Sequence, residues 1–171
     1  GAIAAGASLL VAGKAGATPP ERRLAFHNVH TNERGDARYF GVGGYDSEGL
    51  AEINHGLRDW RTGTIHPIDH DLLDILTRVR DVLDVAPGKP FDLISGYRSP
   101  ATNAALRAEG GARTGVASRS QHLLGKAADV RLSGVPLAKL RLAALQIGAG
   151  GVGFYPRDGF VHIDSGRVRT W

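Results

Sequence analysis

Two histidines and an aspartate stand where they could form a metal site. The stretch SQHLLGKAADVRL (120–132) contains His122 and, seven residues later, Asp129. After 33 further residues, GFVHIDSG (159–166) contains His162. Two neutral imidazoles and one carboxylate are a ligand set of hydrolytic zinc sites, which leave the fourth tetrahedral position to water. Zinc lowers the pKa of that water to about 7, so hydroxide is available at neutral pH. The same spacing also arises by chance, with a histidine in a loop and an aspartate on a strand surface.

Alternation along two predicted strands would bring these residues together. In FVHID the apolar residues Val161 and Ile163 point to one face, which leaves His162 and Asp164 on the other. In KAADVRL the same alternation places Asp129 on the polar face. If the two strands share a sheet, Asp129 and His162 can converge, and the loop histidine before the first strand can close over them.

The rest of the pattern predicts the elements that must hold these residues in place. Apolar stripes and alternating runs, separated by Pro, Gly and Asn, mark their bounds. Asp69 and Ser99 are expected N-caps, the latter with Pro100 at the first helical position. We expect one α+β domain over 20–171, with a mostly antiparallel sheet in its C-terminal half and helices that flank it. Helices are expected over 50–61, 70–83, 100–107 and 137–147, and strands over 22–33, 35–45, 91–95, 126–132, 150–156 and 159–166.

The composition is that of a globular, mildly basic domain. Of the 171 residues, 42% are hydrophobic and 22% are charged, which is typical of a folded protein. The net charge of +4 suits an anionic polymer as partner. No run of Lys and Arg with interleaved aromatic residues supports nucleic-acid binding, so we expect no nucleic-acid partner. Because the chain has no cysteine, disulfides and thiolate metal sites are excluded.

Residues 1–19 are predicted to be the remnant of a secretory signal followed by a linker. GAIAAGASLLVAG (1–13) is small, apolar and uncharged, and Ala15-Gly16-Ala17 matches an A-x-A cleavage signature. A Gly- and Ala-rich run of this kind favours the twin-arginine type of signal, although Arg22-Arg23 lies after the run and is no substitute for its arginine pair. A buried helix is disfavoured because Gly is a poor helix former. The run is too short to span a bilayer, so we expect no stable membrane insertion of the mature domain.

Three motifs in order resemble the zinc D-Ala-D-Ala peptidase family. They are SGYRSPATNAAL (95–106), SQHLLGKAADVRL (120–132) and GGVGFYPRDGFVHIDSGRVRTW (150–171). The family pattern that they match is S-G-[YF]-R-S, then S-x-H-x-x-G-x-A-x-D, then V-H-[IV]-D. More closely, they resemble the branch of exported bacterial murein endopeptidases, within a superfamily that joins lysostaphin-type enzymes, D-Ala-D-Ala metallopeptidases and the hedgehog signalling domain. The resemblance covers nearly all of residues 22–171 and implies the fold of that superfamily.

This resemblance implies roles for four residues. His122, Asp129 and His162 fall on the zinc ligands of the family, so Zn²⁺ is the expected cofactor. Arg98, in SGYRS, falls on the family's arginine near the metal. A guanidinium at that place can hold a substrate carboxylate or carbonyl, or stabilise the oxyanion.

The residue that carries the proton is left open by the resemblance. Some relatives have a glutamate three residues before the last zinc-binding histidine, and others have a histidine two residues before it. This chain has Gly159 and Phe160 at those positions. Asp164 is the first candidate and Asp158, in the adjoining turn, is the second; either could take a proton from the zinc-bound water and pass it to the leaving amine. Asp164 could instead orient a ligand imidazole.

The leading hypothesis is a periplasmic, zinc-dependent murein endopeptidase that hydrolyses peptide cross-links of peptidoglycan during wall growth or remodelling. By resemblance the bond joins D-Ala to meso-diaminopimelate, or joins two diaminopimelates. The carboxylates of peptidoglycan stem peptides suit the basic chain. One alternative is a D-alanyl-D-alanine carboxypeptidase, which the absence of a glutamate at position 159 disfavours. The other is a non-catalytic, zinc-bearing cell-wall-binding module, because a fold alone does not fix a function.

The other conspicuous side chains are expected to have mostly structural roles. Trp171 is interpreted as core or edge packing, and Tyr155 as packing that could also flank the cleft. Ser120 could hold the His122 loop by a hydrogen bond, and Gln121 could line the cleft. Five histidines are interpreted as surface or strand-packing residues: His27, His30, His55, His66 and His70.

Overall fold

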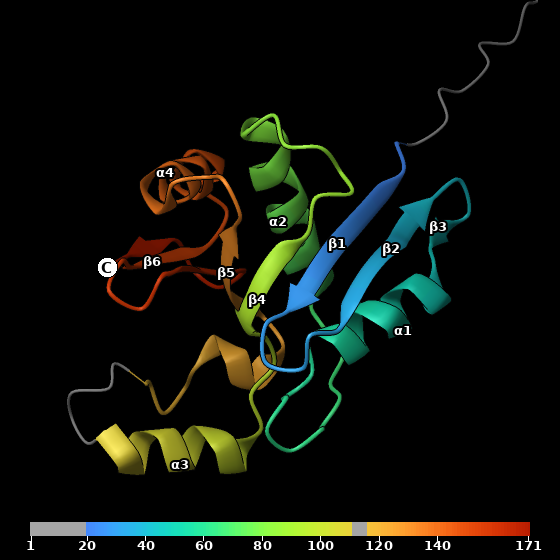
Figure 1. The fold of residues 1–171 in the computed structure, drawn as a ribbon. Helices are drawn as coiled ribbons and strands as arrows, with labels where there is room; N and C mark the ends of the chain where they lie inside the picture. The colour runs from blue at the N-terminus through green and yellow to red at the C-terminus, as the bar shows by residue number, and fades with distance from the viewer. Residues whose placement is uncertain (1–19, 111–115) are drawn as a thin grey trace, which may run out of the picture.

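The strand that carries Asp129 lies inside an eight-stranded sheet (Figure 1). The computed structural model describes residues 20–110 and 116–171, so the expected signal remnant and linker (1–19) lie outside the described residues. The order of the strands across the sheet is β3-β2-β1-β4-β5-β7-β6-β8. Their bounds are β1 (Arg22–Asn28), β2 (Arg34–Gly41), β3 (Gly44–Tyr45), β4 (Phe91–Ser95), β5 (Ala127–Leu132), β6 (Gly151–Tyr155), β7 (Phe160–Asp164) and β8 (Arg169–Thr170).

Neighbouring strands of this sheet run antiparallel except at two places. β1 lies parallel to β4, and β6 lies parallel to β8. The expected α+β fold with a mostly antiparallel sheet is therefore confirmed. The sheet is not confined to the C-terminal half, however, because the β1–β2 hairpin joins it through β4. The two strands of that junction are far apart in the sequence, so no local pattern reveals their pairing.

Three helices pack against the sheet and share its core: α1 (Ser47–Gly56), α2 (His70–Val82) and α4 (Leu137–Ile147) (Figure 1). Their buried side chains meet the inward-facing residues of the strands, which include Val130 of β5 and Val161 of β7. Each fully buried leucine, such as Leu72 and Leu76 of α2, stabilises the fold by about 1.5–3 kcal/mol. This core covers one face of β5 and β7, and their opposite face carries Asp129 and His162.

Helix α1 begins and ends earlier than the stripe over 50–61 predicts. The carboxylate of Asp46 caps it by accepting hydrogen bonds from the backbone N–H groups of Glu48 and Gly49, at 3.0 and 3.1 Å. The helix ends at Gly56, and the following residues form a loop. The ring of Trp60, in that loop, stacks on His30 with centroids 4.0 Å apart. A loop residue can thus pack where the stripe suggests another helical turn.

Two further bounds differ from the expected ones. The strand expected over 35–45 is divided by a turn at Val42 and Gly43 into β2 and β3, and β8 pairs with β6 where the pattern predicts no strand. Asp69 does stand at the N-cap position of α2, but its carboxylate makes no capping hydrogen bond. It accepts one instead from the hydroxyl of Ser165, at 2.5 Å.

Helix α3 (Pro100–Gly110) and the short 3₁₀ helix η2 (Gln121–Leu124) lie where β4 ends and β5 begins (Figure 1). Ser99 caps α3 as expected, because its hydroxyl accepts a hydrogen bond from the backbone N–H of Thr102, at 3.2 Å. Residues 112–115 of the expected surface loop (112–120) lie outside the described residues. Within the described ranges, no helix is both long and apolar enough to cross a membrane.

Candidate metal centre

Asp129 and His162 face each other across two neighbouring strands. The antiparallel register of β5 and β7 pairs Asp129 with His162 and, next to them, Val130 with Val161. The two valines enter the core, so alternation turns the aspartate and the histidine to the opposite face. Asp129 and His162 are nevertheless buried, with 6% and 7% of their surfaces exposed. The structure therefore brings together the two strand residues of the predicted site.

His122 closes over this pair from helix η2. The Ser120 hydroxyl caps η2 by accepting a hydrogen bond from the backbone N–H of His122, at 3.3 Å, as the sequence suggested. The helix ends at Leu124 and is followed by Gly125, whose φ of +65° is costly for other residues. A Cβ there would also lie 2.4 Å from the carbonyl oxygen of Pro67. Glycine thus allows the chain to turn tightly from His122 into β5.

The ligand atoms of the three residues have the spacing that a zinc ion requires. One such atom from each of His122, Asp129 and His162 lies within 4.8 Å of the others. Nε2 of His122 is 3.2 Å from Nδ1 of His162, and these nitrogens lie 3.3 and 2.9 Å from Oδ1 of Asp129. Two nitrogens that each bind a tetrahedral zinc at about 2.05 Å lie about 3.3 Å apart. The donor set and its spacing therefore fit zinc.

The outer nitrogen of each imidazole is held by an acceptor. Nδ1–H of His122 donates to the carbonyl oxygen of Gly96, at 2.7 Å, and Nε2–H of His162 donates to Asp164, at 2.8 Å. These bonds leave the lone pairs of Nε2 in His122 and Nδ1 in His162 directed at the shared centre. Such partners fix the tautomer and the ring orientation of metal-binding histidines.

The charges of the site favour a cation. Burial alone would raise the pKa of Asp129, but the neighbouring His122 and His162 hold it well below its usual range. Burial alone would lower the pKa of His162, but its hydrogen bonds to Asp129 and Asp164 raise it. The carboxylates of Asp129 and Asp164 thus stabilise positive charge on or beside the histidines. The same electrostatic environment favours the binding of a metal cation.

Asp164 lies beneath His162 and its carboxylate is fully engaged. It is completely buried and binds the guanidinium of Arg169 through both oxygens, at 2.7 and 3.0 Å. It also accepts hydrogen bonds from the backbone N–H groups of Gly151 and Gly166, at 3.1 and 2.8 Å. Burial would raise its pKa, but hydrogen bonds with His162, Arg169 and the backbone N–H of Gly166 lower it strongly. This geometry favours the orienting role over that of a proton carrier.

Asp158, the second candidate for the proton carrier, lies elsewhere. It is exposed in the turn between β6 and β7 and is not among the described residues that line the pocket over the metal centre. The backbone of the turn closes by hydrogen bonds from the N–H groups of Asp158 and Gly159 to the carbonyl oxygen of Tyr155. The structure therefore does not bring Asp158 to the three ligands.

Arg98 enters the centre from the segment that joins β4 to α3. It is 8% exposed, and one guanidinium nitrogen is 3.9 Å from Oδ2 of Asp129 while another donates to Asn103 at 3.3 Å. Its Nε has no hydrogen-bond partner among the described residues. Burial lowers the pKa of Arg98, and the charge of Asp129 opposes this shift. Because Arg98 also lines the pocket over the centre, its guanidinium is suited to bind an anionic or carbonyl group.

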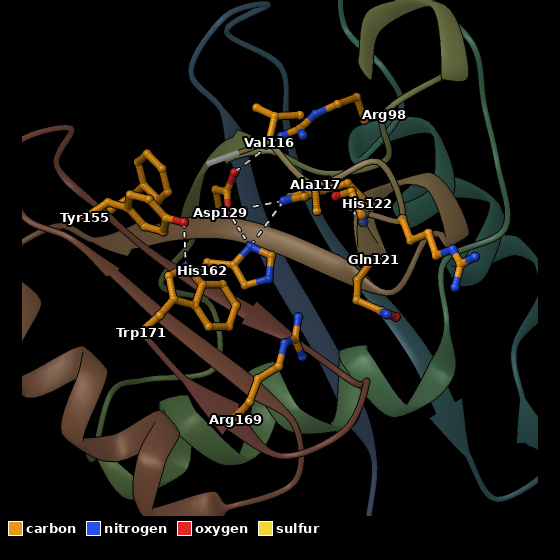
Figure 2. A pocket seen from close by; sticks show the side chains of 13 residues that line it. Arg98, Val116, Ala117, Gln121, His122, Asp129, Tyr155, His162, Arg169 and Trp171 are labelled. Atoms are coloured by element: carbon orange, nitrogen blue, oxygen red, sulfur yellow. Dashed lines mark hydrogen bonds and ion pairs between the residues drawn. The ribbon is translucent and has the colours of Figure 1, made fainter. Parts of the chain in front are cut away.

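A pocket of about 150 Å³ opens above the metal centre (Figure 2). His122, Asp129, His162 and Arg98 line it together with Gln121, which the sequence suggested as a cleft residue. Three aromatic residues complete one side: Tyr155, Phe160 and Trp171. Core or edge packing is the role expected of Trp171, and the structure also places it in the lining of this pocket. Its spacing from His162 carries no periodic signal, because a turn and a separate strand bring it back.

Asp59 is a buried residue of the site that the sequence did not reveal. It is 1% exposed and accepts a hydrogen bond from the backbone N–H of Ser99, at 2.9 Å, next to Arg98 in the chain. It also accepts one from the backbone N–H of Arg61, at 3.0 Å. Burial would raise its pKa, but hydrogen bonds from Thr102 and Ser99 lower it to about 2. Asp59 therefore anchors the segment that carries Arg98.

Replacing Asp59 with asparagine is expected to lower the free energy of unfolding by about 2 kcal/mol at neutral pH. The pKa of Asp59 is about 2 in the folded protein and 3.8 without the fold, and each pKa unit corresponds to about 1.4 kcal/mol. Because the pKa is lowered on folding, this contribution is present above about pH 4 and is lost as the pH falls towards 2. Urea unfolding of both proteins at pH 7, 4 and 3 measures the difference. If the difference in free energy of unfolding between the two proteins stays constant over this pH range, the anchor role of Asp59 is contradicted.

The remaining histidines lie outside the metal centre. Among the described residues, no second group of three potential ligands gathers as these do. His27 bonds Asp92 on the neighbouring strand, and His66 stacks on Tyr97 with centroids 4.5 Å apart. His55 is exposed at the end of α1. The interpretation of these residues as surface or packing histidines agrees with their places in the fold.

Comparison with known proteins shows which family this chain resembles in sequence. A model of the family described as peptidoglycan L,D-endopeptidase MepK matches residues 16–171. The protein of Escherichia coli (strain K12) named peptidoglycan L,D-endopeptidase MepK is 45% identical over 173 residues, which cover 100% of this chain and 92% of that protein. A Haemophilus influenzae protein named probable peptidoglycan L,D-endopeptidase MepK is 38% identical over 154 residues, which cover 90% of this chain and 81% of that protein. No solved structure matches the chain significantly.

Proposed function

The chain belongs to the peptidoglycan L,D-endopeptidase MepK family, and from this premise we propose that it is a zinc-dependent endopeptidase that hydrolyses peptide cross-links of peptidoglycan. The family description favours one of the two cross-links considered above. A bond between two meso-diaminopimelates joins the L-centre of one to the D-centre of the next, whereas a bond from D-Ala to diaminopimelate joins two D-centres. We therefore propose the bond between two diaminopimelates as the substrate.

The observation that carries this proposal is the metal centre itself. His122, Asp129 and His162 form a buried donor set whose spacing fits zinc, and the outer nitrogen of each histidine is already held by an acceptor. Three protein ligands leave one position of a tetrahedral zinc for water or substrate, which distinguishes catalytic from structural sites. A pocket above the centre gives a peptide access to it.

The side chains around the centre have different roles in the proposed hydrolysis. Zinc, when bound, supplies a Lewis acid and a water molecule of lowered pKa. Arg98 is placed to bind a carboxylate of the substrate or the carbonyl oxygen that gains negative charge in the transition state. Asp164 keeps the ring of His162 in place, and Arg169 keeps Asp164 in place. Neither Asp164 nor Asp158 is positioned to take the proton in this arrangement, so we assign Asp164 the orienting role.

Peptidoglycan lies outside the cytoplasmic membrane, so the same proposal places the protein in the periplasm. The small, apolar run over residues 1–13 supports export, and its resemblance to twin-arginine signals is part of the proposal. The net charge of +4 favours contact with a wall polymer that carries free carboxylates.

Incubation of the full chain with purified muropeptide dimers tests this function. We expect that dimers linked by a bond between two diaminopimelates are cleaved to monomers when zinc is present. Chelation of the metal should stop the cleavage, and addition of zinc should restore it. Chromatography with mass spectrometry identifies the products. Released D-alanine would support the carboxypeptidase alternative, and dimers that bind but stay intact would support the wall-binding alternative. Cleavage that survives chelation would contradict the metal mechanism.

A further inference from the structure

The segment after β7 turns back and lays Trp171 against β6. β8 runs parallel to β6, where Gly151 pairs with Arg169 and Val152 with Thr170. The ladder continues one residue further, since the N–H of Trp171 donates to the carbonyl oxygen of Val152 at 3.3 Å. The carbonyl oxygen of Trp171 in turn accepts from the N–H of Phe154, at 3.0 Å. Both backbone groups of Trp171 therefore bond to β6, as in the edge strand of a sheet.

The indole of Trp171 is held as firmly as its backbone. It lies against Gly153, where a Cβ would come within 2.7 Å of the ring. Its Nε1–H donates to the hydroxyl of Tyr155, at 2.6 Å. The guanidinium of Arg169 lies 4.8 Å from the ring centroid and is itself bound to Asp164. The indole is thus fixed by a glycine, a hydrogen bond and a cation before any substrate arrives.

This fixed ring stands beside the metal centre and is still accessible. Its centroid is 5.1 Å from that of His162, yet 47% of the surface of Trp171 is exposed. Tyr155 and Phe160, stacked with centroids 4.7 Å apart, extend the aromatic side of the pocket. Figure 2 shows Trp171 and Arg98 on either side of Asp129 and His162. A group bound at the metal centre would have a flat apolar surface on one side and a guanidinium on the other.

We propose that the indole of Trp171 is a specificity-determining wall that packs against the aliphatic side chain of the residue that contributes the scissile carbonyl. This inference rests on the proposed function, and it assigns recognition of that aliphatic side chain to Trp171. The diaminopimelate at that position has three methylenes between its two charged centres. Methylenes pack favourably on a rigid aromatic face, while the charged end stays in water or meets a cation. A pocket with one aromatic and one cationic side suits this amphipathic chain.

The test compares two synthetic L,D-linked substrates that differ only at this position, one with diaminopimelate and one with L-alanine. For Trp171→Ala we expect a loss of roughly tenfold in kcat/KM on the diaminopimelate substrate, mostly through KM, because the apolar contact is lost. On the alanine substrate, wild type and variant should differ by less than about threefold, because neither packs a side chain there. Trp171→Phe keeps an aromatic ring at this position, so it should lose less of kcat/KM on the diaminopimelate substrate than Trp171→Ala does.

The controls separate a wall from a structural support. Val168, in the same segment and 63% exposed, is not among the pocket residues, so Val168→Ala should match wild type on both substrates. Circular dichroism and the zinc content of each variant are measured alongside. If Trp171→Ala loses zinc, or lowers kcat/KM equally on both substrates, Trp171 acts as a support for His162 and the proposed wall is overturned. If wild type cleaves neither substrate, the proposed function fails first.

Discussion

Replacing His162 with alanine is expected to remove one zinc ligand and to lower peptidoglycan hydrolysis by about a thousandfold or more. A bound metal contributes several kcal/mol to transition-state stabilisation, and each 1.36 kcal/mol corresponds to a tenfold change in rate. Only two of the three proposed ligands, His122 and Asp129, would remain, and two ligands hold zinc less tightly than three. The change would also leave the carboxylate of Asp164 without its imidazole partner. Zinc content by mass spectrometry and the rate of dimer cleavage are the two measurements.

A histidine elsewhere on the surface provides the matched control for this variant. His55 is exposed at the end of α1, and its hydrogen-bond contact is with Arg58. His55→Ala should keep one zinc per chain and the wild-type rate. A His162→Ala protein that binds zinc normally and cleaves dimers at the wild-type rate would contradict the metal centre. A variant that retains zinc but loses activity would instead place His162 in the chemistry without making it a ligand.

The convergence of Asp129 and His162 could be predicted because it depends on local rules. Alternation along a strand assigns each residue to a face, and the apolar neighbours Val130 and Val161 identify the buried one. Gly125 marks the tight turn that returns the chain from His122 into β5. The capping role of Ser99 before α3 follows from local chemistry in the same way.

The residues that support the ligands could not be predicted because their roles depend on contacts between distant segments. Asp59 anchors the segment of Arg98 across 40 positions of sequence, and nothing in the local pattern of residues 57–61 indicates a buried carboxylate. The apolar stripe there continues to Trp60 and predicts a longer helix. Arg169 and Trp171 reach the centre only because β8 pairs with β6 beyond a turn. Alternation placed Asp164 beside His162 but gave no measure of its burial, which decides between its two roles.

Replacing Asp164 with asparagine is the experiment that separates those two roles. An asparagine places one NH2 group either at Oδ1, where Arg169 and the backbone N–H groups of Gly151 and Gly166 donate, or at Oδ2, where Arg169 and His162 donate. In either orientation a donor faces other donors where only an acceptor fits. Because the side chain of Arg169 is 27% exposed, the loss of stability should lie below the about 3–5 kcal/mol that removing one partner of a fully buried ion pair costs. Losing the partner that orients a ligand imidazole lowers metal affinity by about 10–100-fold. We therefore expect lower stability and weaker zinc binding.

The kinetics of the zinc-saturated Asp164→Asn protein decide the matter. If Asp164 orients His162, excess zinc should restore much of the hydrolysis, because the chemistry itself does not pass through this carboxylate. If Asp164 carried the proton, zinc would bind normally and kcat would fall by about 10²–10⁴-fold at any zinc concentration. Asp158→Asn is the matched control, since Asp158 is exposed in the turn and lies outside the pocket. It should leave zinc affinity, stability and kcat unchanged, and a fall in its kcat alone would assign the proton transfer to Asp158.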